Sequence, residues 1–247
     1  MAQGLRLDKI LSLAGISRSE AKKLIAAGRV TINGTTTRDP GAKAEIHQVA
    51  LDGQTVGAEQ EVYLMLHKPA GVITATEDKK LPTVMDFIPE KYHKRKIGPV
   101  GRLDRDVTGL VIMTTDGEMA HRLISPKWKA EKCYEATCEG ALNESHIAAF
   151  AEGIELSDFT AMPAGLEILS VSNGQSTARV TLTEGKFHQV KRMFIAIGHP
   201  LTRLSRLRIG CVTLDENLPE GEFRPLTEDE INGLKALTGL NRQEKTP

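Results

Sequence analysis

The stretch Gly101-Arg102-Leu103-Asp104-Arg105-Asp106-Val107-Thr108-Gly109-Leu110 places four charged side chains between glycines, directly ahead of an apolar run. That run, residues 110–115, predicts a buried strand, which Asp116-Gly117 closes with a turn. An aspartate in a loop of this kind is usually a turn or cap residue. Four charges within five residues are less usual. Such charges can partly neutralise one another, and the loop that carries them can approach a phosphate. The spacing of Asp104 and Asp106 lacks the further oxygen ligands of a calcium loop, so we predict no metal site here.

Two later motifs carry further reactive side chains. The segment Glu131-Lys132-Cys133-Tyr134-Glu135-Ala136 predicts a strand that opens at Tyr134, where a tyrosine at a sheet edge would be ordinary. The segment Glu184-Gly185-Lys186-Phe187-His188-Gln189-Val190-Lys191-Arg192-Met193 predicts a glycine turn that leads into a helix with a basic first half. His188 is a candidate general base, but the sequence places no nucleophile beside it. The chain shows no nucleophile-elbow, P-loop or dinucleotide-binding motif.

The pattern around these motifs is that of an α+β domain. Asn173-Gly174 between two apolar runs indicates a hairpin, and the hairpin signals favour antiparallel pairing. We therefore predict a mostly antiparallel mixed sheet with helices over residues 62–235. The expected strands are residues 62–66, 72–74, 110–115, 134–139, 154–156, 166–171 and 177–182, and the expected helices are residues 118–125, 143–153 and 187–198.

The first 57 residues are interpreted as a separate, small α+β unit. Apolar residues recur at helical spacing from Leu7 onward, and Ser17 with Glu20 forms the capping box of a second helix. A short strand then runs into the turn Asn33-Gly34. The polar segment 52–60 is interpreted as the linker region. We place the two domains at residues 1–57 and 62–235, the linker itself at 58–61 and a C-terminal tail at 236–247.

Basic residues are unevenly distributed, although lysine plus arginine equals aspartate plus glutamate, at 32 each. Residues 183–210 hold six basic residues and one acidic residue, whereas residues 135–182 hold one and seven. Basic segments that meet on one face would form a phosphate-binding surface. Lys22 follows Arg18 by four residues in a predicted helix, and a bound anion would relieve their repulsion. The candidate anion-binding residues of the first unit are Arg6, Lys9, Arg18, Lys22, Lys23 and Arg29.

Composition and cysteine count exclude several classes of protein. Hydrophobic residues make up 40% of the chain and charged residues 26%, as in ordinary globular proteins. Three cysteines without paired spacing argue against a disulfide framework and against a zinc site. The first residues contain no apolar signal core, and no run approaches the ~18 apolar residues of a membrane span. We therefore expect a cytoplasmic protein with no membrane partner.

The N-terminal unit resembles the S4 RNA-binding domain through Leu7-Asp8-Lys9, Gly15, Ser17-Arg18, Gly28 and Asn33-Gly34. The motifs GRLD…TGL, EKxYxA and EGxxHQVKRM, in this order, resemble those of the pseudouridine synthases. The segments His67-Lys68-Pro69-Ala70-Gly71 and Gly221-Glu222-Phe223-Arg224-Pro225-Leu226-Thr227 are similar to the small-subunit, RsuA-type branch of that family. The resemblance extends from residue 5 to about residue 234. It implies a small S4 domain followed by a pseudouridine synthase catalytic domain.

The resemblance also assigns roles to single residues. It implies that Asp104 is the family's essential aspartate, that Tyr134 is its active-site tyrosine and that Lys191 is the basic residue paired with Asp104. Many relatives carry arginine at the position of Lys191, and the neighbouring Arg192 is an alternative partner for Asp104. The resemblance further implies that Arg102, Arg105 and Arg192 contact RNA.

The implied reaction breaks the C1′–N1 bond of a uridine in RNA, turns the uracil and rejoins it through C5. Because nothing is oxidised, the resemblance implies no cofactor and no metal. Asp104 would attack C1′ or act as a base on the sugar, and a cation beside it would favour its ionised form. Tyr134 would stack on the uracil of a nucleotide flipped out of the folded RNA.

We expect a monomer that acts on one uridine of 16S rRNA, either in naked RNA or within a small-subunit assembly intermediate. One alternative is a 23S rRNA pseudouridine synthase of the same family. His188 and Lys191 favour the 16S target, because large-subunit relatives tend to carry a non-histidine residue and arginine at these positions. A second alternative is an S4-type rRNA-binding or ribosome-assembly protein without catalytic activity, against which Asp104, Tyr134 and Lys191 argue.

Overall fold

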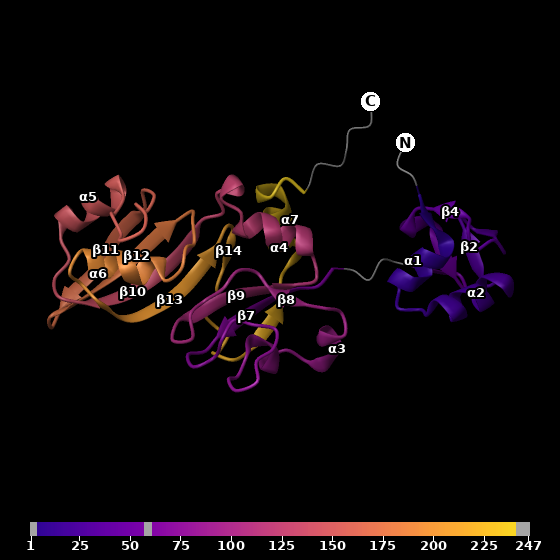
Figure 1. Cartoon of the computed structure of the whole chain (residues 1–247), viewed down its shortest axis with the longest axis horizontal. Helices are drawn as coiled ribbons and strands as arrows, with labels where there is room; N and C mark the ends of the chain where they lie inside the picture. The colour runs from indigo at the N-terminus through magenta and orange to yellow at the C-terminus, as the bar shows by residue number, and fades with distance from the viewer. Residues whose placement is uncertain (1–3, 57–60, 241–247) are drawn as a thin grey trace, which may run out of the picture. The chain divides into compact units, whose positions relative to one another are not determined.

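The computed structural model describes residues 4–56 and 61–240, which belong to two compact units divided between Glu61 and Val62. Figure 1 labels many of the elements of both units. The linker expected at residues 58–61 lies, apart from Glu61, outside the described residues, and so does the expected tail from residue 241 onward.

The first unit packs two helices against short antiparallel strands. Helix α2 begins as predicted, because the Ser17 hydroxyl oxygen accepts a hydrogen bond from the Glu20 amide at 3.3 Å. Leu7, Leu11 and Ile25 are fully buried in the core of this unit. The elements are β1 (Leu5–Arg6), α1 (Leu7–Leu13), α2 (Arg18–Ala26), β2 (Val30–Ile32), β3 (Thr35–Thr36), β4 (Lys43–Ala44), β5 (Val49–Leu51) and β6 (Gln54–Thr55), with sheets ordered β3-β2-β5-β6 and β1-β4.

The segment 52–56 is a hairpin rather than the linker that its polarity suggests. Asp52 and Gly53 both have positive φ values, 51° and 80°, and form the turn between β5 and β6. The Val56 amide donates to the Val49 carbonyl at 2.6 Å, and Val56 is buried in the core of the first unit. Asp-Gly is a favoured hairpin turn, so the polar composition belongs to a turn within the domain.

The second unit is built on one nine-stranded sheet with the path β11-β12-β10-β13-β9-β7-β15, with β14 on β13 and β8 on β9. Among its described strand pairs, β9 and β13 run parallel and the others antiparallel, which confirms the predicted mostly antiparallel mixed sheet. The strands are β7 (Tyr63–Lys68), β8 (Gly98–Pro99), β9 (Thr108–Thr114), β10 (Lys132–Glu139), β11 (Gly165–Ser172), β12 (Gln175–Leu182), β13 (Leu201–Ile209), β14 (Val212–Thr213) and β15 (Phe223–Pro225). The helices are α3 (Glu90–His93), α4 (Gly117–Ile124), α5 (Glu144–Glu152), α6 (Gln189–Ala196) and α7 (Glu228–Leu237).

Strand β9 is buried on both faces of this sheet. Val111 belongs to the core cluster that contains Phe150 of α5 and Phe194 of α6. Leu110 belongs to a second cluster, which contains Met119 of α4. A strand covered on both faces has a continuous apolar sequence, which explains why residues 110–115 are the clearest strand signal in the chain.

Strand β13 and the start of α6 differ from the sequence expectations. The leucines of β13, Leu201, Leu204 and Leu207, recur every three residues rather than every two. The pairing of β10 with β13 shifts register twice along the ladder, and each shift interrupts the alternation of side chains between the two faces. An alternating strand pattern is therefore absent, and β13 is not predicted. Helix α6 begins at Gln189 rather than at residue 187, because His188 adopts a left-handed φ of 50° at the N-cap.

The C-terminal segment continues the second domain beyond the expected boundary at residue 235. Helix α7 runs to Leu237, Thr238 is fully buried, and Leu240 packs against the core. Residues 236–240 are therefore part of the domain, which corrects the expected tail.

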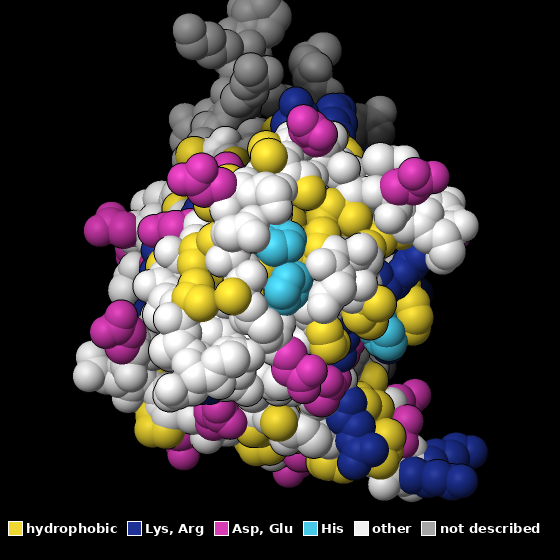
Figure 2. All heavy atoms as spheres, turned by 90° about the vertical axis from the view of Figure 1, so that its left-hand side faces the viewer, with side chains coloured by type: hydrophobic (Ala, Val, Ile, Leu, Met, Phe, Trp, Pro, Cys, Tyr) yellow, Lys and Arg dark blue, Asp and Glu magenta, His cyan; other side chains and the backbone are white. Residues whose placement is uncertain are grey.

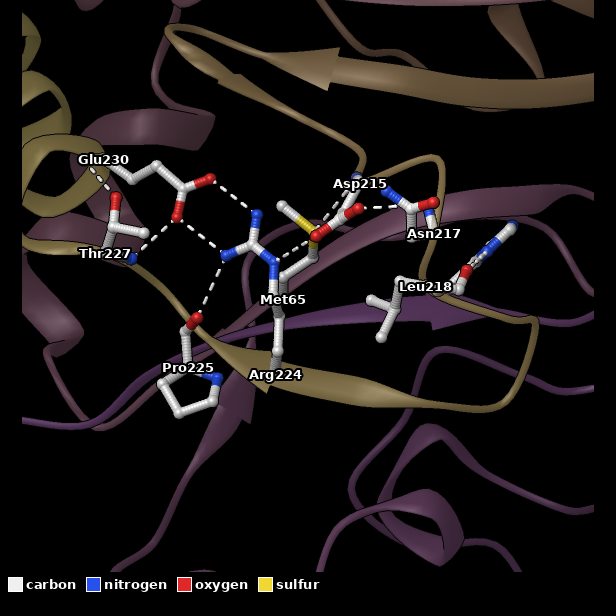
Figure 3. Close-up of polar contacts among 9 residues, drawn as sticks. Met65, Asp215, Asn217, Leu218, Arg224, Pro225, Thr227 and Glu230 are labelled. Atoms are coloured by element: carbon white, nitrogen blue, oxygen red, sulfur yellow. Dashed lines mark hydrogen bonds and ion pairs between the residues drawn. The ribbon is translucent and has the colours of Figure 1, made fainter.

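Arg224 joins strand β15 to helix α7, as Figure 3 shows. Its two terminal nitrogens each donate to the Glu230 carboxylate at 2.9 Å, and its Nε donates to Asp215 at 3.0 Å. Because β15 pairs with β7, this network supports the strand that ends at Lys68.

Candidate active site

Lys68 anchors the loop that carries Asp104. Its side chain is fully buried at the end of β7, and its ammonium donates to the carbonyl oxygens of Pro69, Arg105 and Val107 at 2.9, 3.3 and 2.6 Å. Burial lowers the pKa of Lys68 to about 8. Sequence reasoning did not assign this anchor a role, although Lys68 lies only two residues beyond the apolar run 62–66, which is a signal for a buried cation.

Thr74 and Gly109 fix the two sides of the same loop. The Thr74 hydroxyl donates to the Leu103 carbonyl at 2.8 Å and accepts from the Leu103 amide at 3.1 Å. Gly109 has a φ of 108°, and a Cβ atom there would lie 2.3 Å from the Arg206 carbonyl oxygen. Only glycine permits this close approach of β9 to β13. Arg206 of β13 also lies opposite Tyr134 of β10. The close approach of β9 to β13 therefore brings the loop that carries Asp104 next to the strand that carries Tyr134.

Asp104 lies in a cluster of charged side chains contributed by the loop and by α6. The Lys191 ammonium is 2.9 Å from one Asp104 oxygen and 2.7 Å from Asp106, and the Nε2 atom of His188 is 3.3 Å from the other Asp104 oxygen. Desolvation opposes the charge on Lys191, but the bonds to Asp106 and Asp104 outweigh it and raise the pKa of Lys191. The bond from Lys191 lowers the pKa of Asp106. The cluster therefore holds a carboxylate and a cation in contact at a fixed position.

The structure distinguishes between the two proposed partners of Asp104. Arg192 forms an ion pair with Asp158, whereas Lys191 contacts Asp104. Within the described part of the chain, the charged side chains of the loop form no ion pair with one another: Asp104 and Asp106 pair with Lys191, and the Arg105 Nε donates to the carbonyl of Gly71. His188, which lacks a partner in the sequence reasoning, contacts Asp104. That contact joins residues 84 positions apart in the chain, so local sequence cannot reveal it.

A cavity of about 710 Å³ opens onto this cluster. Arg102, Asp104, Tyr134, Lys191 and Phe187 line it, so the three predicted catalytic residues share one cavity. Tyr134 is buried, whereas the Phe187 side chain is 75% exposed and stacks on His188 with ring centroids 3.7 Å apart. An exposed aromatic ring beside a cavity is a platform on which a nucleobase can stack.

The candidate RNA-binding cations fall into two groups. Lys9, Arg18, Lys22 and Lys23 are exposed and form no ion pair among the residues that the structure describes. Arg6 pairs with Asp8, and Arg29 pairs with Asp52. In the second unit, Arg102 and Arg105 are exposed and line the cavity, whereas Arg192 lies outside its lining.

One end of the second unit is poor in basic side chains. Figure 2 shows the end that carries α5 and β11, with acidic side chains across the face and lysine and arginine side chains toward its edges. Residues 135–182, which include α5, β11 and β12, supply seven acidic residues and one basic residue. The basic segments therefore do not meet on this face.

Within residues 4–56 and 61–240, no group of three or more histidine, cysteine, aspartate or glutamate side chains is arranged to hold a metal ion. No helix in the described part of the chain is long and apolar enough to cross a membrane.

The fold and the cluster together define a class of RNA-modifying enzyme. Residues 62–196 match the family model for RNA pseudouridylate synthase, and residues 5–49 match the model of the S4 domain. The chain therefore belongs to the RNA pseudouridylate synthase family, and it is a pseudouridine synthase with an N-terminal S4 domain. The family, the fold class and the enzyme class predicted from the sequence are confirmed.

Individual relatives match along nearly the whole chain. The chain is 42% identical to ribosomal small subunit pseudouridine synthase A of Escherichia coli over 233 residues, which cover 92% of this chain and 98% of the relative. It is 41% identical to an RNA pseudouridine synthase of Aquifex aeolicus over 242 residues, which cover 97% and 100%. A crystal structure of a pseudouridylate synthase matches with a TM-score of 0.66 and 39% identity, covering 94% of this chain and all of the other.

Proposed function

We propose that this protein converts one specific uridine of 16S rRNA to pseudouridine, with Asp104 as the catalytic residue. The observation that carries the proposal is the placement of Asp104 in the cavity, between Lys191 and His188 and beside Tyr134. The 16S target is supported by the relative from Escherichia coli, whose name specifies the small ribosomal subunit and which is 42% identical to this chain.

The reaction places specific demands on the cavity. The C1′–N1 bond of the uridine breaks and a C1′–C5 bond forms, while C5 loses a proton and N1 gains one. Cleavage builds positive charge at C1′, which an adjacent carboxylate stabilises. Asp104 meets this demand, either as a nucleophile toward C1′ or as a base on the sugar.

Lys191 and Tyr134 act beside Asp104. The Lys191 ammonium, 2.9 Å from Asp104, fixes the orientation of the carboxylate. The ring of Tyr134 provides a flat surface for the flipped uracil while the base turns. His188 contacts the other oxygen of Asp104, and its ring stacks against one face of Phe187.

The N-terminal unit supplies RNA affinity in this proposal. Its exposed cations, Lys9, Arg18, Lys22 and Lys23, attract RNA phosphates, and Arg102 and Arg105 hold the strand at the cavity. The protein acts in the cytoplasm as a monomer, on 16S rRNA or on an assembly intermediate of the small subunit.

Mapping of pseudouridines in rRNA tests the proposal. Carbodiimide treatment and primer extension are applied to 16S and 23S rRNA from cells that lack the protein. We expect the loss of one 16S site, which the wild-type protein restores and Asp104→Asn does not. Loss of a 23S site would overturn the 16S target and leave the chemistry in place. Two intact rRNAs would favour the non-catalytic RNA-binding alternative.

A further inference from the structure

The cavity is lined by two buried cations that the mechanism does not use. Lys132 of β10 and Arg206 of β13 are 9% and 3% exposed, and both line the large cavity with Asp104 and Tyr134. A smaller recess of about 80 Å³ is also lined by Asp104 and Tyr134 but by neither of these cations. Lys132 and Arg206 therefore belong to a part of the cavity beyond the catalytic cluster.

The sheet places the two cations on one face beside Tyr134. Lys132 and Tyr134 are two residues apart in a regular stretch of β10 against β12, so their side chains point to the same face. Arg206 lies directly opposite Tyr134 in the adjacent ladder. On its other side Arg206 faces Gly109, which has no side chain to cover it.

Neither cation is neutralised. Among the described residues, the Lys132 ammonium has no hydrogen bond and no ion pair. Arg206 donates from Nε to the Leu110 carbonyl at 2.9 Å, but its Nη2 atom is buried and has no hydrogen-bond partner within residues 4–56 and 61–240. Lys68 provides the contrast, because its buried ammonium reaches three carbonyl oxygens. Burial and the nearby charge of Arg206 lower the pKa of Lys132.

Two adjacent, buried and unpaired cations are costly in a folded protein unless an anion joins them. A carbonyl oxygen of uracil carries only partial charge and would not offset two cations. RNA supplies a full negative charge at every phosphodiester, and such a group forms strong bonds with lysine and arginine. The chemistry of the site therefore matches a backbone phosphate.

We propose that Lys132 and Arg206 form a subsite for a phosphodiester of the RNA strand next to the target uridine. The inference rests on the proposed placement of that uridine against Tyr134 and Asp104. The subsite positions the flipped nucleotide by holding its backbone, while Asp104 performs the chemistry.

The first test compares Lys132→Met with Lys132→Arg and with Lys129→Met, an exposed control in the segment before β10. The RNA is the rRNA fragment that the wild-type enzyme modifies. We expect Lys132→Met to weaken binding about tenfold and to reduce the slope of log affinity against log salt by about 0.7. Lys132→Arg and Lys129→Met should bind as the wild type does. Unchanged binding by Lys132→Met would overturn the proposal.

Thermal stability distinguishes a phosphate-binding role of Lys132 from a purely structural role. Removal of an unpaired buried charge should leave the melting temperature of Lys132→Met equal to or above that of the wild type, whereas a structural lysine would lower it. A lower melting temperature with unchanged RNA affinity would contradict the proposal.

Neutral methylphosphonate linkages identify the phosphate directly. One linkage is replaced at a time, 5′ and 3′ of the target uridine. We expect one of these replacements to weaken binding by the wild type and to have no further effect on Lys132→Met. Equal responses of both proteins at every linkage would overturn the proposal. Because the readout is binding rather than product formation, the result is independent of the role of Asp104 and of the rRNA that carries the target.

Discussion

The two units of the chain offer a contrast between two uses of positive charge. In the catalytic unit, Lys191 lies between two carboxylates and Lys68 is buried against three carbonyl oxygens. In the N-terminal unit, Lys9, Arg18, Lys22 and Lys23 are exposed and form no ion pair among the described residues. Charges that are paired with carboxylates or carbonyl oxygens hold a geometry, whereas exposed charges attract phosphate and are screened by salt. We therefore expect the rate of the chemical step and the affinity for RNA to be separable.

The largest expected effect comes from Asp104→Asn, which keeps the shape of the side chain and removes its charge. Single-turnover pseudouridine formation should fall at least about 10³-fold, because the positive charge at C1′ loses its carboxylate. The dissociation constant for RNA should change by less than about threefold. Turnover near the wild-type rate would remove Asp104 from the mechanism.

Lys68→Met tests the buried framework behind Asp104. Three carbonyl oxygens lose their donor, at about 1 kcal/mol each, so the free energy of unfolding should fall by about 3 kcal/mol. Denaturant titration at pH 7 measures this loss. A matched change at an exposed pair of the other unit, Arg29→Gln, should lower the free energy of unfolding far less, because the pair is solvent-exposed and screened.

The same variant tests the lowered pKa of Lys68. The folded value is about 8, whereas the unfolded value is about 10.4. Between these values the unfolded chain binds more protons, so the free energy of unfolding of the wild type should rise with pH relative to Lys68→Met. A stability difference that stays constant from pH 7 to pH 10 would contradict the lowered pKa.

Lys191→Met and Arg192→Met form a matched pair on α6. Lys191 contacts Asp104 and Arg192 contacts Asp158, so we expect an approximately 10²-fold lower chemical rate for Lys191→Met. Arg192→Met should retain a rate within about threefold of the wild type. A larger rate loss in Arg192→Met than in Lys191→Met would reverse the assignment.

The smallest effect is expected from the exposed charges of the N-terminal unit. The combined variant Lys9→Gln, Arg18→Gln, Lys22→Gln and Lys23→Gln should weaken RNA binding about tenfold and reduce the salt slope by about 3. The double variant Arg6→Gln and Arg29→Gln should have less effect, because Asp8 and Asp52 already neutralise these residues. Filter binding across a salt series measures both. An unchanged slope in the combined variant would mean that these cations do not contact RNA.

Features of the fold that depend on local sequence could be predicted. The Ser17 cap, the Asn33-Gly34 turn and the buried run of β9 each follow from neighbouring residues. Strand β13 could not be predicted, because its irregular pairing with β10 removes the alternation that identifies a strand. The hairpin at Asp52 was misinterpreted because a turn and a linker have the same polar composition.

The site shows the same division between local and distant information. Motif order indicated Asp104, Tyr134 and Lys191, and all three line the cavity. The contact of His188 with Asp104 and the position of Lys132 in the cavity arise from packing between distant segments, which spacing along the chain does not reveal.

The separation of chemistry from RNA attraction is tested most directly by one titration. Single-turnover rates are measured against enzyme concentration for the wild type and for the combined variant of Lys9, Arg18, Lys22 and Lys23. We expect the same maximal rate for both proteins and a half-saturating concentration about tenfold higher for the variant. A lower maximal rate at saturation would show that the N-terminal cations act in the chemical step, which would contradict the separation.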